Sequence, residues 1–169
     1  MKLNLFVIPI ITIATAVIGG LITSGGMAWY ETLKLPWFTP SGNIIGSVWT
    51  VLFVLTAISA IIFYNAARRN ITFSWVIVIF ILNAILNVAW SYLFFYKYAV
   101  AAATFEAGLL SATVIALVIL IWQASLRAGR NAALLRLASV LLIPYAVWVI
   151  FATYLTFSVW TLNYGVLCC

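Results

Sequence analysis

Five apolar stretches, each long enough to cross a bilayer, constrain this chain more than any other feature. A membrane-spanning helix needs about 20 predominantly apolar residues. The 169-residue sequence offers such runs at approximately 3–27, 44–66, 72–96, 99–126 and 132–160. Since almost nothing is left between them, we expect one domain over residues 1–169. Its predicted fold class is an all-α membrane protein, a bundle of five transmembrane helices with a structured first loop.

The composition excludes several classes of function. Only 6% of the residues are charged, against about 25% in soluble domains. There is no histidine, and Asp and Glu together number two, so conventional hydrolytic sites, zinc sites and histidine-ligated haem are not expected. We predict no metal site and no required cofactor. The basic residues are scattered rather than interleaved with aromatics on a polar face, which argues against nucleic acid as a partner.

The distribution of basic residues predicts an orientation in the membrane. Five spans place the N-terminus, the second loop and the fourth loop on one side, with Lys2, Arg68, Arg69, Arg127, Arg130 and Arg136. The positive-inside rule then puts the N-terminus in the cytoplasm, and the first loop and C-terminus outside the cell membrane. A cleaved signal peptide is the alternative for the first span, because Lys2 precedes an apolar run. That run continues well beyond Ala16, which favours a retained span.

Two spans carry a small residue at every fourth position, which allows helices to approach closely in lipid. The stripes are Thr12, Ala16, Gly20 and Ser24 in the first span, and Ala99, Ala103, Ala107 and Ser111 in the fourth. Packing within the bundle and a homodimer interface both remain open. Pro144 lies inside the fifth span, where it is expected to kink the helix.

Helical spacing brings polar and aromatic side chains onto three stripes well inside their spans. The stripes are Asn83, Asn87, Trp90, Ser91 and Phe94; Trp49 and Phe53; and Pro144, Trp148, Ala152 and Leu155. If the stripes converge, they enclose a cavity suited to a flat, apolar, polycyclic ligand. The alternative is a plain aromatic core.

Three further groups invite a functional interpretation. Glu106 is the only acidic residue within a span, so it is either a functional acid or a structural glutamate near the interface. Lys34, in the first loop, could contact a ligand carboxylate. The adjacent Cys168 and Cys169 could be lipidated or form a thiol pair, or they could belong to an unstructured tail.

The motifs as a whole resemble the translocator protein or tryptophan-rich sensory protein family, also known as peripheral-type benzodiazepine receptors. The matching segments are 29–40, 48–53, 83–95 and 141–155, which include Trp29-Tyr30, Val48-Trp49 and Asn87-Val88-Ala89-Trp90. The resemblance implies a bacterial membrane receptor or sensor, often a homodimer, with a pocket under the first loop. It also implies binding of porphyrins and of benzodiazepine- or isoquinoline-type ligands.

Carried over to this sequence, the resemblance implies ligand contacts from Tyr30, Pro40, Trp49, Phe53, Asn87, Trp90, Phe94, Tyr145, Trp148, Ala152 and Leu155. Trp49 and Trp148 match tryptophans implicated in light-dependent porphyrin degradation, so enzymatic turnover is an open question. Two residues differ from the family pattern. Ser41 stands where the family loop has its second proline. Thr161, after Trp160, replaces the basic residue that the cholesterol motif of animal members has. The alternative function is a transporter of porphyrin or amphipathic molecules, with Glu106 coupling to protons.

Overall fold

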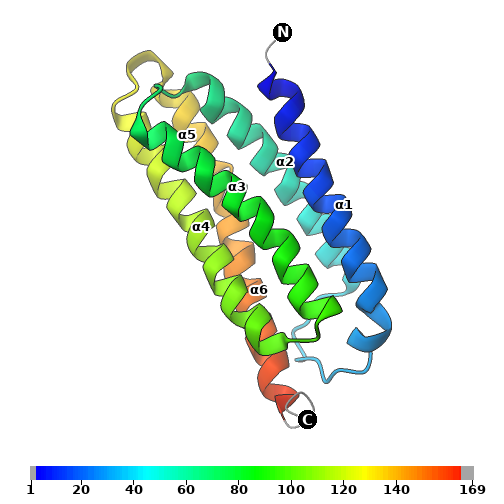
Figure 1. The fold of residues 1–169 in the computed structure, drawn as a ribbon. Coiled ribbons are helices and arrows are strands. Elements are labelled where there is room, and N and C mark those ends of the chain that lie inside the picture. The colour runs from blue at the N-terminus through cyan, green and yellow to red at the C-terminus, as the bar shows by residue number, and fades with distance from the viewer. Residues whose placement is uncertain (1–2, 165–169) are drawn as a thin grey trace.

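The computed structural model describes residues 3–164 and consists of long helices in one elongated bundle (Figure 1). They are α1 (Asn4–Tyr30), α2 (Gly42–Ala66), α3 (Ile71–Ser91) with the π-helix η1 (Tyr92–Tyr96), and α4 (Val100–Leu126). A 3₁₀ turn η2 (Gly129–Asn131), α5 (Ala132–Val140) and α6 (Ile143–Leu162) follow. The described residues form five spans long and apolar enough to cross a membrane, with η2, α5 and α6 making the fifth. The predicted fold class is therefore confirmed.

The span boundaries differ from the sequence prediction mainly around the first loop. Trp29 and Tyr30, assigned to that loop from the sequence, belong to the last turn of α1. The loop therefore covers Glu31–Ser41 and is shorter than expected. In the fifth span the helix is interrupted at Leu141–Leu142, and Pro144 lies in the first turn of α6. That position tolerates proline because its missing N–H would have had no partner there.

Figure 1 shows which ends of the helices lie together. The start of α1, the α2–α3 turn and the α4–α5 turn occupy one end of the bundle, and the first loop and the end of α6 occupy the other. We call the first the basic end, because Arg68, Arg69, Arg127 and Arg130 lie in its turns. Asn70 there starts α3, since its Oδ1 accepts a hydrogen bond from the Phe73 backbone N–H at 3.0 Å.

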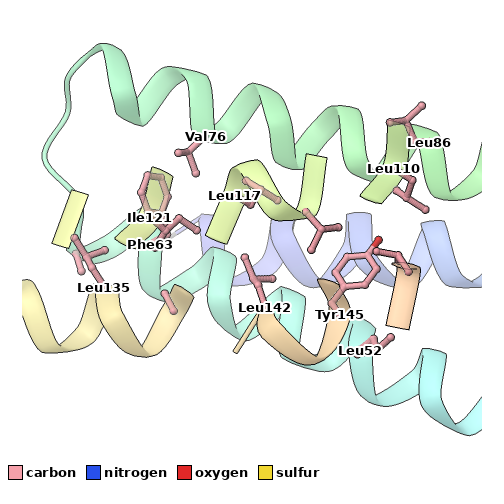
Figure 2. Packing of buried hydrophobic residues seen from close by; sticks show 14 residues of the cluster. Leu52, Phe63, Val76, Leu86, Leu110, Leu117, Ile121, Leu135, Leu142 and Tyr145 are labelled. Atoms are coloured by element: carbon pink, nitrogen blue, oxygen red, sulfur yellow. The ribbon is translucent and has the colours of Figure 1, made fainter. Parts of the chain in front are cut away.

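The core is centred on α4, and α1 lies at the periphery. Ten residues of α4 are buried, against two in α1. Figure 2 shows side chains from α2 to α6 meeting around Leu117, Ile121 and Leu142, which are fully buried. Lipid tails are as apolar as the helix surfaces, so the hydrophobic effect does not drive the helices together. Close packing of side chains such as these stabilises the bundle instead. The shallow embedding of α1 leaves space between it and the rest of the bundle.

The small residues of α1 that pack against the bundle are not the predicted stripe. Gly26 lies against η1 so closely that an added Cβ would come within 2.7 Å of the Phe95 Cβ, and Gly19 faces Ser91. At Gly20, an added Cβ would meet nothing within 4 Å. The α4 stripe does pack inside the bundle, because Ala103, Ala107 and Ser111 are buried there.

Candidate functional site

A large cavity of about 1330 Å³ lies between α1, α2, α3 and α6 beneath the first loop. It forms because α1 stands away from the bundle core along most of its length. Ten of the residues singled out from the sequence line it together: Tyr30, Pro40, Trp49, Phe53, Asn87, Trp90, Phe94, Trp148, Ala152 and Leu155. The three predicted stripes therefore converge on one space, except at Asn83 and Pro144, which do not line it.

The aromatic walls of this cavity are built from ring pairs on each helix. Trp90 at the end of α3 and Phe94 in η1 stack at 5.2 Å between ring centroids, and Trp49 and Phe53 lie 5.7 Å apart on α2. On α6, Trp148 lies 5.4 Å from Phe151. These pairs are one helical turn or less apart in sequence, so helix geometry alone holds neighbouring rings together. The walls offer flat apolar surface for a ring system.

One polar atom of a wall residue is buried without a partner within the described residues. Trp148 lines the cavity, and its Nε1–H is buried with no hydrogen-bond partner among residues 3–164. A buried donor without an acceptor costs about 1–3 kcal/mol.

A cluster of buried, hydrogen-bonded polar side chains lies behind Asn87 in the wall of the large cavity. Asn87 Nδ2 donates to the Tyr145 hydroxyl at 2.6 Å, and that hydroxyl donates to Asn83 Oδ1 at 3.0 Å. Asn83 Nδ2 donates in turn to Thr113 Oγ1 at 2.9 Å. The cluster joins α3, α4 and α6. Because its donors are used internally, it fixes the side-chain amide of Asn87 where that residue reaches the cavity.

Asn83 and Tyr145, both predicted to contact the ligand, do not line the large cavity. They line a smaller one of about 300 Å³, between α1, α2 and α3 toward the basic end. Trp49, Phe53 and Asn87 border both spaces. Helical spacing placed Asn83 beside the ligand, because it gives the face of a helix but not the depth at which a cavity divides. Tyr145 was placed there by the family resemblance.

Residues of α1 contribute more to the large cavity than the sequence predicted. Thr12, Ala16, Gly20 and Ser24 line it, so this stripe faces the cavity rather than a neighbouring helix. Met27 lines it too. Met27 belongs to none of the three predicted stripes, and its thioether is a group that can ligate haem iron.

The first loop is fastened to α6 by Asn163, which the sequence analysis missed. The Lys34 backbone N–H donates to Asn163 Oδ1 at 3.0 Å, and Asn163 Nδ2 donates to the Lys34 carbonyl at 2.9 Å. Asn163 is only 4% exposed. The Lys34 side chain is exposed and does not line the cavity, and its contact with a ligand carboxylate stays a prediction. A polar residue at the end of an apolar span was the only available signal for Asn163.

Glu106 is apart from both cavities. Its two carboxylate oxygens are buried and have no hydrogen-bond partner within residues 3–164. It does not line either space. No group of three potential metal-ligating His, Cys, Asp or Glu residues occurs in the described part of the chain. Cys168 and Cys169 lie outside the described residues.

The comparisons with known proteins agree with this architecture. Residues 6–161 match the model of the TspO/MBR family. The chain is 36% identical over 155 residues to the uncharacterized membrane protein YtaB of Bacillus subtilis, covering 91% of this chain and 92% of that protein. It is 35% identical to the tryptophan-rich protein TspO of Bacillus cereus, over 80% of each chain. It is 30% identical to the protein CrtK of Rhodobacter capsulatus, over 98% of this chain and 96% of that one. The chain therefore belongs to the TspO/MBR family and is an integral membrane protein.

Proposed function

We propose that the protein is a membrane receptor or sensor that binds a porphyrin in the large cavity. The observation that carries this proposal is the convergence of Trp49, Trp90 and Trp148 on a space of about 1330 Å³. Pockets for drug-sized ligands measure about 300–1,000 Å³. The space is thus large enough for a ligand of greater size, and its ring-lined walls suit a flat macrocycle.

Binding is favoured over proton-coupled transport. Such transport would depend on Glu106, which lines neither cavity. A proton path also needs several ionisable or polar groups along a route. Within the described part of the chain, the walls of the large cavity hold no acidic or basic side chain. This composition supports retention of an apolar ligand.

Titration of the purified protein in lipid nanodiscs with free-base protoporphyrin tests the proposal. Tryptophan fluorescence should be quenched saturably. Trp148→Ala should weaken binding by about 1–3 kcal/mol, or about 5- to 150-fold, by analogy with bases stacked on aromatic residues. Trp75→Ala is the matched control, because Trp75 is 58% exposed on α3 and lines neither cavity. Equal affinities for the two variants would refute binding at this wall.

The same complex tests the suggestion of light-dependent turnover. Trp49 and Trp148 both line the large cavity, so bound porphyrin would contact both. Illumination in air, with the porphyrin absorbance followed over time, separates stable binding from degradation. If the tryptophans take part, Trp49→Phe and Trp148→Phe should slow the loss of absorbance while largely retaining affinity.

A further inference from the structure

The smaller cavity near the basic end has features of a second binding site. It lies between the first half of α1, residues 49–64 of α2 and residues 77–87 of α3. Five residues form the border that it shares with the large cavity: Thr12, Thr15, Trp49, Phe53 and Asn87. At about 300 Å³ it has less than a quarter of the volume of the large cavity, and it lies at the lower limit for ligand pockets. A macrocycle is therefore not its ligand.

The cavity is elongated and faces the region that lipid chains would occupy. Its lining on α1 runs from Leu3 to Thr15, which is about 18 Å at 1.5 Å per residue. Leu3, Val7 and Ile11 line it and are also exposed on the outer surface of the bundle. A slender apolar chain could thus enter sideways and lie along α1. Most other lining residues are aliphatic or aromatic.

Polar groups gather at the end of this cavity nearest the basic end. The Asn4 Nδ2 is buried and has no hydrogen-bond partner within the described residues, and Asn4 lines the cavity. Tyr64 lines it as well, and the Arg69 guanidinium lies 4.1 Å from the Tyr64 ring centroid. Arg69 is exposed and also lies over the Phe73 ring at 3.9 Å.

The charge of Arg69 is not matched by acidic groups of this chain at that end. Glu31 follows α1 at the opposite end of the bundle. Glu106 is in the second turn of α4, which also starts at that opposite end. These are the only two acidic residues in the sequence. Arg69 itself does not line the cavity, but the Tyr64 ring that it contacts does, so a positive charge neighbours this end of an apolar channel.

We propose that the smaller cavity binds a single-chain amphiphile with a carboxylate head, a long-chain fatty acid. The chain lies along α1 between Val7 and Thr15, and the carboxylate lies at the end lined by Asn4 and Tyr64, where its charge is complementary to that of Arg69. Hydrogen bonds to an ionised acceptor are about twice as strong as neutral ones, so an acid should be preferred over an alcohol of the same length. The narrow volume selects one chain over the two chains of a phospholipid.

The Thr56 hydroxyl is a polar group in the wall beside which the alkyl chain would lie. Thr56 Oγ1 is buried without a partner within residues 3–164, whereas Thr12 and Thr15 donate to the carbonyl one turn earlier. Rotation of the Thr56 side chain would give it the same type of bond. An alkyl chain beside it therefore leaves no new polar group unsatisfied. Thr56→Val should leave binding of the acid unchanged.

A photoreactive long-chain fatty acid with a diazirine on its chain tests the proposal in phosphatidylcholine nanodiscs. The cross-links should map to the cavity walls, at residues 7–15 of α1, 56–60 of α2 and 77–84 of α3. Excess unlabelled dodecanoate should suppress labelling about tenfold more effectively than dodecanol. Labelling spread evenly over the bundle surface, or equal competition by the alcohol, would overturn the proposal. So would equal labelling of these walls by a diazirine phosphatidylcholine.

Two pairs of variants distinguish loss of binding in the smaller cavity from general effects on labelling. Ala60→Leu fills the smaller cavity, whereas Ala57→Leu projects into the large one from the same helix. Arg69→Gln removes the guanidinium beside Tyr64, whereas Arg68→Gln removes the same charge from the neighbouring position. Ala60→Leu and Arg69→Gln should each lower specific labelling about fivefold or more, and the two controls should change it less than twofold.

The Arg69 pair keeps the test decisive even if Ala60→Leu does not fold. Arg69 is exposed in the α2–α3 turn, so its replacement should leave the thermal unfolding transition in place. Unchanged labelling in a folded Arg69→Gln variant would refute the attraction between the ligand carboxylate and Arg69. The proposal is independent of porphyrin binding, because the two ligands occupy different cavities.

Discussion

The contact between α1 and the π-helix η1 gives a prediction whose magnitude follows from the geometry. In Gly26→Ala the new Cβ would lie 2.7 Å from the Phe95 Cβ and 3.0 Å from its Cα. Both neighbours belong to a firmly packed segment, since Phe95 is 7% exposed. The helix must therefore move, and overpacking of this type costs about 1–3 kcal/mol.

The same substitution one residue earlier provides the control. At Gly25 an added Cβ would meet nothing within 4 Å. Replacing a helical glycine by alanine there should stabilise the protein by about 0.5–1 kcal/mol. The same propensity gain applies to both positions, so the two variants should differ by the overpacking cost, about 1–3 kcal/mol. At about 2–4 °C per kcal/mol for a chain of this size, Gly26→Ala should melt about 2–12 °C below Gly25→Ala.

Thermal unfolding of both variants in the same nanodiscs, followed by tryptophan fluorescence, measures this difference. Gly20→Ala should behave as Gly25→Ala does, because it too has open space around the added Cβ. If Gly26→Ala is as stable as the other two, α1 does not pack against η1 as described. Met27 and Tyr30, which follow Gly26, would then lose their fixed place in the cavity wall.

Three further predictions concern the loop, the ligand and the orientation. Asn163→Ala should speed porphyrin dissociation about 5- to 30-fold in stopped-flow measurements, because it frees both backbone groups of Lys34 from α6. Lys34→Ala keeps those bonds, which we call the Asn163 clamp, and should have little effect on the dissociation rate. Equal dissociation rates for the two variants would refute the role of the clamp. Haem and free-base protoporphyrin should bind with affinities within about tenfold of each other, and Met27→Leu should change neither by more than about threefold, since ring stacking needs no iron. Much tighter binding of haem that is lost in Met27→Leu would show ligation by the thioether. A membrane-impermeant maleimide should label Cys168 and Cys169 on intact cells, with any outer membrane permeabilised, because the basic residues predict an external C-terminus. Labelling only after lysis would contradict this orientation.

The sequence was sufficient for the spans and for the faces of three helices. Trp49 and Phe53 on α2, and Trp148 and Ala152 on α6, are four residues apart, and helix geometry alone gives them a common face. These residues all lie in the wall of the large cavity. Their positions follow from local periodicity, which the sequence contains.

The face that α1 turns toward the bundle could not be read in the same way. Thr12, Ala16 and Gly20 form one small-residue stripe, while Gly19 and Gly26 lie on another, and composition does not distinguish them. The second stripe contacts Ser91 and Phe95. That choice depends on the shape of η1, whose hydrogen bond from the Lys97 N–H to the Tyr92 carbonyl spans five residues. Such long-range fits have no local signature, and the same holds for the Asn163 clamp and the division into two cavities.

The most direct test of porphyrin binding in the large cavity is the effect of Ala152→Leu on affinity and stability together. Ala152 is half-buried and lines the cavity beside Trp148 and Leu155. If the space receives the ligand, the added carbons occupy it, so protoporphyrin affinity should fall about tenfold or more while the melting temperature changes by less than about 3 °C. A filled aromatic core would instead lose about 1–3 kcal/mol of stability through overpacking. A lowered melting temperature with unchanged protoporphyrin affinity would contradict binding at this site.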